Sequence, residues 1–173
     1  MSNPVAPLSL LVRPNILALQ PYTSARDEFT GAAAIFLDAN ENSLGSPLAT
    51  DYSRYPDPQQ QVLKNKLAAL KGLSTRQIFV GNGSDEAIDL LLRGFVEPGR
   101  DNMLILPPTY GMYAVQANIH GAEIRRVPLL PDFSPDVPAI RAATDERSKL
   151  LFLCSPNNPT GQCLPAAFVL EML

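Results

Sequence analysis

The architecture of this chain follows from one segment, Ile78-Phe79-Val80-Gly81-Asn82-Gly83-Ser84-Asp85-Glu86-Ala87-Ile88-Asp89-Leu90-Leu91-Leu92. Its first three residues are apolar and two of them are β-branched, which predicts a short buried strand. Two glycines then break the pattern, and Ser84 or Asp85 can cap the helix that the apolar spacing of 87–95 predicts. A strand, a glycine turn and a helix start bring free backbone amides and the positive end of a helix together, which favours an anion site.

Two well-known phosphate-binding loops contain similar residues, but neither fits this segment. A Walker loop ends in Gly-Lys-Ser/Thr, and no lysine lies between Lys71 and Lys149. The dinucleotide fingerprint needs a third glycine where this chain has Glu86. Taken alone, the segment is equally consistent with an ordinary strand–helix turn that binds no ligand. The choice between an anion site and a turn without a ligand therefore depends on the rest of the sequence.

The composition is that of a globular chain of one ordinary domain, with 46% hydrophobic and 18% charged residues among 173. There are 14 basic and 17 acidic residues, and no basic run, which argues against nucleic acid and anionic membranes as partners. No apolar run approaches the ~20 residues that cross a bilayer. The start, Met1-Ser2-Asn3-Pro4, has no features of a secretory signal.

The metal-binding and redox residues are few. Cys154 and Cys163 lack metal-ligand spacing and indicate a reducing compartment, so we expect a cytoplasmic protein. His120 is the only histidine, which argues against a multi-histidine metal site and against a Ser-His-Asp triad. Its place before Gly121 is typical of a helix end. We therefore expect no metal.

Strands and helices alternate along most of the chain. Apolar runs predict further strands at 103–106, 123–128 and 149–154. Helical spacing and turn residues predict helices at 13–19, 58–71, 110–120, 134–143 and from 165 onward, and residues 1–11 read as a loose arm. Strands that are apolar on both faces form a mostly parallel sheet flanked by helices, which is an α/β fold.

Three loops lie beyond the carboxyl ends of these strands, where such sheets bind ligands: 81–86, 107–110 and 155–161. The first offers amides to a phosphate. Tyr110, held behind two prolines, offers a flat face to an aromatic ring, and Asn158 offers an amide next to a proline where a cis peptide can form. Together they predict a site for a phosphorylated aromatic cofactor. Taken singly, Tyr110 reads equally as a core or helix-start aromatic, and Asn158 as a turn former.

Several segments carry a family resemblance. Three of them resemble the marker loops of fold-type I pyridoxal-phosphate aminotransferases: Gly83-Ser84-Asp85-Glu86, Pro107-Pro108-Thr109-Tyr110-Gly111-Met112-Tyr113 and Ser155-Pro156-Asn157-Asn158-Pro159-Thr160-Gly161. Four others more narrowly resemble the histidinol-phosphate aminotransferases: Leu19-Gln20-Pro21-Tyr22, Ser24-Ala25-Arg26, Leu37-Asp38-Ala39-Asn40-Glu41-Asn42 and Arg54-Tyr55-Pro56-Asp57. The likeness runs from about Arg13 to the last residue. It implies an incomplete large domain over 46–173, preceded by an N-terminal arm and part of a small domain over 1–45.

The resemblance implies cofactor-binding roles for the residues that match. Backbone amides of Ser84 and Asp85 would hold the phosphate of pyridoxal 5'-phosphate. Tyr110 would stack on the pyridine ring, and Asn158 would hydrogen-bond the phenolic oxygen of that ring. Tyr55 would reach the phosphate bound by the neighbouring subunit, which implies a homodimer with shared sites. As a plain turn aromatic, Tyr55 would have no such role.

The resemblance also implies a substrate side, lined by Tyr22 and by the loop that contains Asn42. Tyr22 could instead be an exposed tyrosine that anchors the arm, since its hydroxyl needs only one partner. The implied reaction moves an amino group between histidinol phosphate and 2-oxoglutarate, in histidine biosynthesis.

The chain departs from the family in its lysines. Such an aminotransferase needs a lysine that forms a Schiff base with the cofactor and then moves the proton. This chain has only Lys64, Lys66, Lys71 and Lys149, and none stands where the family places that residue. We therefore expect an N-terminal half whose native chain continues, with no catalytic residue of its own, no transaminase activity by itself and exposed strand edges that promote aggregation.

Other functions stay open on these residues. One is a related aminotransferase for aromatic or other amino acids, or a phospho-amino-acid decarboxylase of the same fold. Another is a non-catalytic remnant that binds a partner or a phosphate ligand. The missing lysine favours the remnant, whereas the intact cofactor loops favour the enzyme family.

Overall fold

The computed structural model describes residues 7–23, 35, 37–50 and 52–173. It divides into two compact units, one formed by 1–19 with 81–173 and the other by 20–80. The predicted domain boundary at 45/46 stays a prediction. Among the described residues, no helix has both the length and the apolar character that crossing a bilayer requires.

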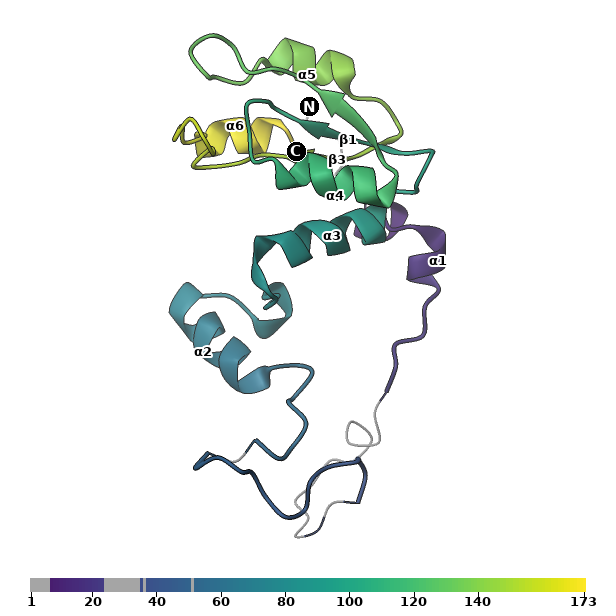
Figure 1. The fold of residues 1–173 in the computed structure, drawn as a ribbon. Coiled ribbons are helices and arrows are strands. Elements are labelled where there is room, and N and C mark those ends of the chain that lie inside the picture. The colour runs from purple at the N-terminus through teal and green to yellow at the C-terminus, as the bar shows by residue number, and fades with distance from the viewer. Residues whose placement is uncertain (1–6, 24–34, 36, 51) are drawn as a thin grey trace. The chain divides into compact units, whose positions relative to one another are not determined.

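The first unit contains a parallel three-stranded sheet. Its strands are β1 (Asn102–Ile105), β2 (Glu123–Arg126) and β3 (Ser148–Phe152), in the order β2-β1-β3 (Figure 1). Both pairings are parallel, and Ile105 of β1 lies opposite Arg126 of β2 and Phe152 of β3. The predicted α/β class with a parallel sheet is confirmed. All four residues of the central strand are buried, as expected for a strand covered on both faces.

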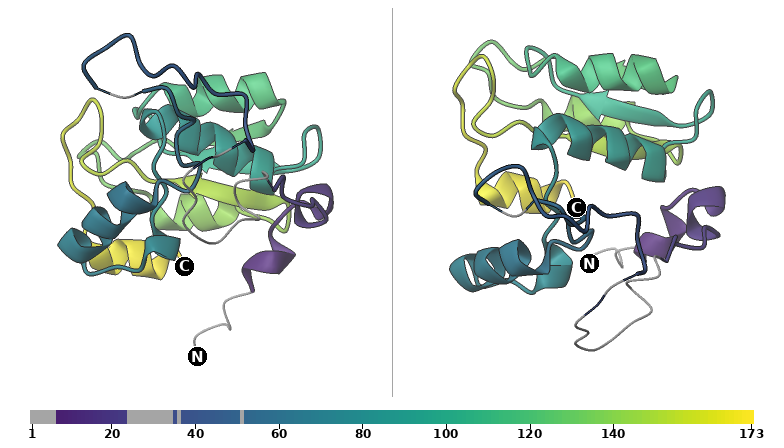
Figure 2. Two further views of the ribbon diagram at one scale, coloured as in Figure 1. Left: turned by 90° about the horizontal axis from the view of Figure 1, so that it is seen from below. Right: turned by 60° about the horizontal axis from the view of Figure 1, so that its bottom comes forward.

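Helices cover both faces of this sheet (Figure 2). On one face, the buried core joins α3 (Gly83–Phe95) and α4 (Met112–His120) to Met103 and Ile105 of β1. On the other, α5 (Val137–Ala143) and α6 (Ala166–Glu171) pack on Leu104 and Leu106. Successive residues of β1 thus point to opposite faces, as the strand geometry requires. The carboxyl end of β1 therefore emerges between two helical layers.

The segment 78–80 is not a strand, so this prediction is wrong. Ile78 ends the 3-10 turn η2 (Thr75–Gln77), and Phe79 is 57% exposed. A strand needs a neighbouring backbone to complete its hydrogen bonds, and none of the described residues pairs with 78–80 in a sheet. The sequence pattern of 78–80 indicates residues that favour a strand, but it does not show whether a neighbouring strand is available to pair with them.

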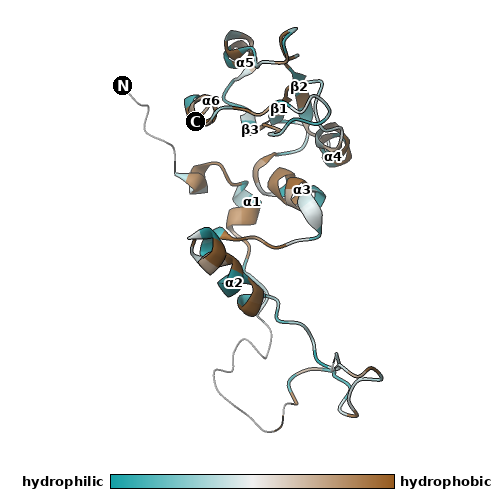
Figure 3. Ribbon diagram, turned by 90° about the vertical axis from the view of Figure 1, so that its left-hand side faces the viewer, coloured by the Kyte–Doolittle hydropathy of each residue, from teal (hydrophilic) through white to brown (hydrophobic). Residues whose placement is uncertain are grey.

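The glycine turn and the helix after it are confirmed, but the predicted cap is wrong. The N-cap of α3 is Asn82 rather than Ser84 or Asp85. A carboxylate oxygen of Glu86 reaches back to the backbone and side-chain amides of Asn82, so it takes over the capping role. Figure 3 shows polar and apolar residues on different sides of α3, whose buried residues are Ile88 and Leu92.

The predicted glycine ends of two helices are confirmed, whereas their predicted starts are too early. Gly121 ends α4 at φ +77°, and Gly72 ends α2 (Gln61–Lys71) at φ +66°. The predicted start of α2 at Pro58 is three residues early, because the Asp57 carboxylate accepts from the amides of Gln59 and Gln61 and holds this segment in a turn. The helix α4 begins two residues after the predicted Tyr110.

The N-terminal segment docks on α3. It contains η1 (Leu8–Leu10), inside the stretch that the sequence reads as a loose arm, and the predicted short helix, α1 (Pro14–Leu17). Arg13 makes a two-pronged ion pair with Glu97, at 2.8 and 3.2 Å, and donates to the Arg93 carbonyl at 2.9 Å. The Arg13 amide also donates to the Gly94 carbonyl. Residues 1–6 of the predicted arm lie outside the described residues.

Candidate functional site

The first turn of α3 presents unused amides. No acceptor among the described residues takes the backbone N–H of Ser84 or Asp85, whereas the Glu86 carboxylate occupies the amide of Asn82. Ser84 is exposed, and Gly83 has φ +80°, a conformation that glycine adopts without strain. An anion placed here would meet free N–H groups and the positive end of the helix dipole.

Tyr110 follows β1 and contacts this turn directly. Its hydroxyl donates to Oδ1 of Asp85 at 3.0 Å. This hydrogen bond, with some burial, raises the pKa of Tyr110. The ring meets Tyr113 edge-on, with centroids 5.5 Å apart at 87°, and Tyr113 stacks on Phe152 of β3 with centroids 4.7 Å apart. Tyr110 is therefore fixed both at its hydroxyl and at one side of its ring.

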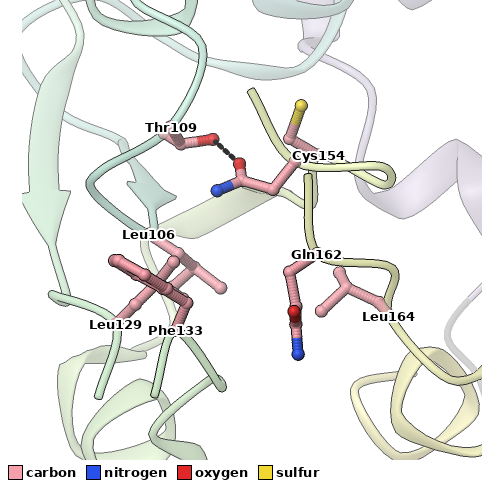
Figure 4. A pocket seen from close by; sticks show the side chains of 8 residues that line it. Leu106, Thr109, Leu129, Phe133, Cys154, Gln162 and Leu164 are labelled. Atoms are coloured by element: carbon pink, nitrogen blue, oxygen red, sulfur yellow. Dashed lines mark hydrogen bonds between the residues drawn. The ribbon is translucent and has the colours of Figure 1, made fainter. Parts of the chain in front are cut away.

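The loop after β3 is held to the loop after β1 by Asn157. The Thr109 hydroxyl donates to Asn157 Oδ1 at 3.0 Å (Figure 4). In return, Asn157 Nδ2 donates to the Pro108 carbonyl and to Thr160 Oγ1, both at 2.9 Å. Only 8% of Asn157 is exposed. These bonds fix the two loops side by side at the carboxyl end of the sheet.

The role of Asn157 is not predicted from the sequence. The sequence predicts a site role for Asn158, its neighbour before the proline. The structure instead buries Asn157 and leaves Asn158 exposed, with no side-chain hydrogen bond to any described residue. The Asn158–Pro159 peptide is cis, as the sequence allowed. No pattern in two adjacent asparagines distinguishes the buried one from the exposed one.

A small pocket lies beside these loops (Figure 4). Leu106 and Leu129 form its apolar side and belong to the core against α5 and α6. Tyr110, in contrast, packs with the core beneath α3 and α4. The pocket therefore lies mainly toward the opposite face from Tyr110, and Asn157 borders it.

The other predicted site residues, Tyr22, Asn42 and Tyr55, lie in the second unit. Asn42 Nδ2 donates to the Gly45 carbonyl at 2.7 Å, and Asn42 Oδ1 accepts from the Leu44 amide at 3.1 Å, so both ends of this side chain serve its own loop. Tyr22 is 91% exposed and Tyr55 is 62% exposed.

The turn that carries Tyr55 is held by Glu41. Oε1 of Glu41 accepts from the Tyr55 amide at 2.8 Å, and Oε2 pairs with Arg54 at 2.6 Å. The Tyr55 ring is therefore presented from a fixed turn.

Of the seven predicted site residues, the structure brings Asp85 and Tyr110 into direct contact. Ser84 precedes Asp85 in the same helical turn, and Asn158 follows the residue that joins the second and third loops. Hydrogen bonds between Tyr110 and Asp85, and between Asn157 and the segment that precedes Tyr110, thus link three loops that are far apart in the sequence. They combine free amides, an aromatic ring and an uncommitted carboxamide, which suits a phosphorylated aromatic molecule.

Comparison with curated proteins gives consistent relatives. The histidinol-phosphate aminotransferase of Parabacteroides distasonis is 52% identical over 163 residues, which is 94% of this chain and 46% of that protein. The protein of the same name from Cytophaga hutchinsonii is 54% identical over 157 residues, 91% of this chain and 45% of that protein. This chain spans about half the length of the curated relatives it matches.

A solved structure supports the same relationship. The histidinol-phosphate aminotransferase of Sinorhizobium meliloti, crystallised in complex with pyridoxal-5'-phosphate, has a TM-score of 0.61 and 28% identity. The match covers 68% of this chain and 32% of that one. A family model described as aminotransferase class I and II matches residues 36–173. This chain belongs to the aminotransferase class I and II family.

Proposed function

We propose that this chain binds pyridoxal 5'-phosphate and supplies the cofactor-binding part of a histidinol-phosphate aminotransferase. One observation carries the proposal: the Tyr110–Asp85 bond and the Asn157 bonds to Pro108 and Thr109 gather three loops at the carboxyl end of the sheet. The names of the relatives and the cofactor in the Sinorhizobium structure support it.

The residues present fit this cofactor. The free amides of Ser84 and Asp85 would bind the phosphate, and the ring of Tyr110 would stack on the pyridine. Asn158 would donate to the phenolic oxygen, because its amide has no partner among the described residues. When bound, the cofactor supplies an electron sink for amino-group transfer. The chain's own part is to bind and orient it.

The substrates that we propose are histidinol phosphate and 2-oxoglutarate, which the amino-group transfer would convert to imidazole-acetol phosphate and glutamate. Tyr22 and Asn42 would line the substrate side, and Tyr55 would reach the phosphate of a second copy in a homodimer. The fixed Glu41–Tyr55 turn supports such a role, because a rigid base makes an exposed aromatic an effective contact. We also propose a cytoplasmic location, in keeping with the free thiols of Cys154 and Cys163.

We further propose that these 173 residues bind the cofactor without transaminating. Lys149 lies in β3 with its ammonium donating to the Glu146 carbonyl at 3.2 Å, at the amino end of the strand and away from the loops. A side chain that is to carry the cofactor covalently has to stand beside it, and Lys149 does not. The other three lysines, Lys64, Lys66 and Lys71, belong to α2 and to none of the three loops.

Equilibrium dialysis tests the binding proposal. The purified protein is dialysed against pyridoxal 5'-phosphate, pyridoxal and inorganic phosphate in separate experiments. We expect the intact cofactor to bind about ten-fold or more tightly than either part, because phosphate and ring are held together. Equal affinity for inorganic phosphate would contradict the proposal and would favour a simple phosphate site.

Two further measurements complete the test. Asn158→Ala should weaken cofactor binding, whereas Asn118→Ala, at an exposed position of α4 away from the loops, should not. Incubation with histidinol phosphate, 2-oxoglutarate and cofactor should yield no glutamate from this chain alone. Glutamate formation would refute the argument from the lysines.

A further inference from the structure

We infer that Asn157 is the positioning residue of the cofactor site: it fixes Tyr110 and Asn158 relative to each other before any ligand arrives. This inference rests on the proposed function. Asn157 precedes Asn158 directly, and two of its three side-chain partners, Pro108 and Thr109, are the two residues before Tyr110. One side chain therefore controls the separation of two residues that are 48 positions apart in the chain.

The hydrogen bonds of Asn157 leave it little freedom. Both protons of Nδ2 are donated, to Pro108 O and Thr160 Oγ1, and Oδ1 accepts from the Thr109 hydroxyl. The Asn157 amide donates to the Gln162 carbonyl at 2.7 Å, and its carbonyl accepts from the Gly161 amide at 2.7 Å. The side chain thus fixes the second loop while the backbone closes the third.

The consequence for binding is preorganisation. A ring and a carboxamide that are already spaced correctly lose less freedom when the cofactor binds, so affinity increases without any contact from Asn157 itself. Asp85 completes the arrangement, since its bond to Tyr110 fixes the same ring from the phosphate side. Without Asn157 the loops after β1 and β3 would keep their own folds and lose their common spacing.

A variant series separates positioning from simple stabilisation. Asn157→Ala removes all three side-chain bonds, whereas Thr109→Val removes only the bond to Oδ1 and keeps the link to Pro108. Asn157→Asp keeps an acceptor for Thr109 but sets an oxygen against the Pro108 carbonyl. Asn118→Ala is the matched control on α4. Each variant is studied well below its own unfolding temperature, so that folded protein is compared.

Two readouts are measured on each variant: the dissociation constant for pyridoxal 5'-phosphate and the amide hydrogen exchange of 113–115 and 157–162. The amides of Tyr113, Ala114 and Val115 donate to the carbonyls of Tyr110 and Gly111, and those of Asn157 and Gly161 close the loop after β3, so both segments hold amides that report on their loops. We expect Asn157→Ala to bind about ten-fold more weakly or worse, in line with the loss of several buried hydrogen bonds. Thr109→Val should fall between Asn157→Ala and the wild type. Exchange should become faster in both segments together, and Asn118→Ala should match the wild type.

Several results would overturn the inference. One is an unchanged cofactor affinity in folded Asn157→Ala, which would leave Asn157 a stabilising residue only. Another is faster exchange in the loop after β3 alone. Should Asn157→Ala fail to fold, Thr109→Val decides the question by the same two readouts. Absence of cofactor binding in the wild type would instead refute the proposed function, and the exchange measurement would still show whether Asn157 couples the loops.

Discussion

The hydroxyl of Tyr110 donates a hydrogen bond of 3.0 Å to the carboxylate of Asp85, 25 residues earlier in the chain. This bond joins the loop after β1 to the first turn of α3. A carboxylate in the first turn of a helix also interacts favourably with the helix dipole, so Asp85 stabilises its own helix start while it holds Tyr110. The free amides at the start of α3 and the ring of Tyr110 are thereby coupled.

The first prediction separates the ring of Tyr110 from its hydroxyl. Tyr110→Phe keeps the aromatic face and loses the bond to Asp85, so cofactor affinity should fall by no more than about three-fold. Tyr110→Ala loses the stacking face as well, and affinity should fall roughly ten-fold. Equilibrium dialysis measures both. Equal losses in the two variants would mean that the hydroxyl, and not the ring, matters for binding.

Much of the fold could be predicted because hydrophobic patterns report burial well. Met103 to Leu106 is apolar without interruption, and its first three residues belong to the buried central strand with helices on both faces. Glycine signals were also reliable, since Gly72 and Gly121 adopt the left-handed conformation that other residues avoid. An apolar run and a glycine at a helix end both depend on residues that are neighbours in the sequence, so the sequence alone is enough to predict them.

Other features depended on contacts that no local pattern records. The β-forming segment 78–80 lacks a pairing partner among the described residues, and a carboxylate from Asp57 delays the start of α2. In the site, the loops and Tyr110 could be predicted from position and residue type. The choice between Asn157 and Asn158 could not, because it depends on which of two identical side chains faces the neighbouring loop.

The second prediction concerns the core beneath α3. Leu92 is fully buried and packs with Met103 and Ile105 of β1. Leu92→Ala should lower the free energy of unfolding by about 2–5 kcal/mol, through lost burial and the cavity left behind. Leu90→Ala is the matched control on the same helix, since Leu90 is 45% exposed, and it should cost less than about 1 kcal/mol. Urea unfolding measures both, and similar losses would contradict the assigned face of α3.

The third prediction concerns the docking of the N-terminal segment by Arg13. Arg13→Ala removes the two-pronged pair with Glu97 and the bond to the Arg93 carbonyl, so proteases should cleave residues 7–19 faster. Arg13→Lys should give partial protection, because an ammonium cannot reproduce the planar fork of the guanidinium. Global stability should change little, since pairs at the surface contribute modestly.

The control for Arg13 is Arg141→Ala, which breaks a single exposed contact of 3.2 Å with Glu171. Limited proteolysis with mass spectrometry identifies the cleavage sites in each variant. Unchanged cleavage of 7–19 in Arg13→Ala would show that the backbone bond from Arg13 to Gly94 is enough to hold the segment.

The last prediction concerns stability at high pH. Burial, together with the nearby Cys154 thiol, raises the pKa of Tyr113 to about 12, above the value of about 10 for a tyrosine in an unfolded chain. Between these values the unfolded chain loses the proton and the folded chain keeps it. The contribution of Tyr113 to stability is therefore intact below about pH 10 and falls as the pH rises toward about 12.

Urea unfolding at a series of alkaline pH values measures this loss. Tyr113→Phe removes the titrating group, so its stability should decline less steeply over the same range. Tyr52→Phe, at a position that is 71% exposed, is the control and should decline as the wild type does. An equally steep decline in Tyr113→Phe would mean that other groups account for the alkaline loss, and that the Tyr113 hydroxyl is open to solvent despite its stacking on Phe152.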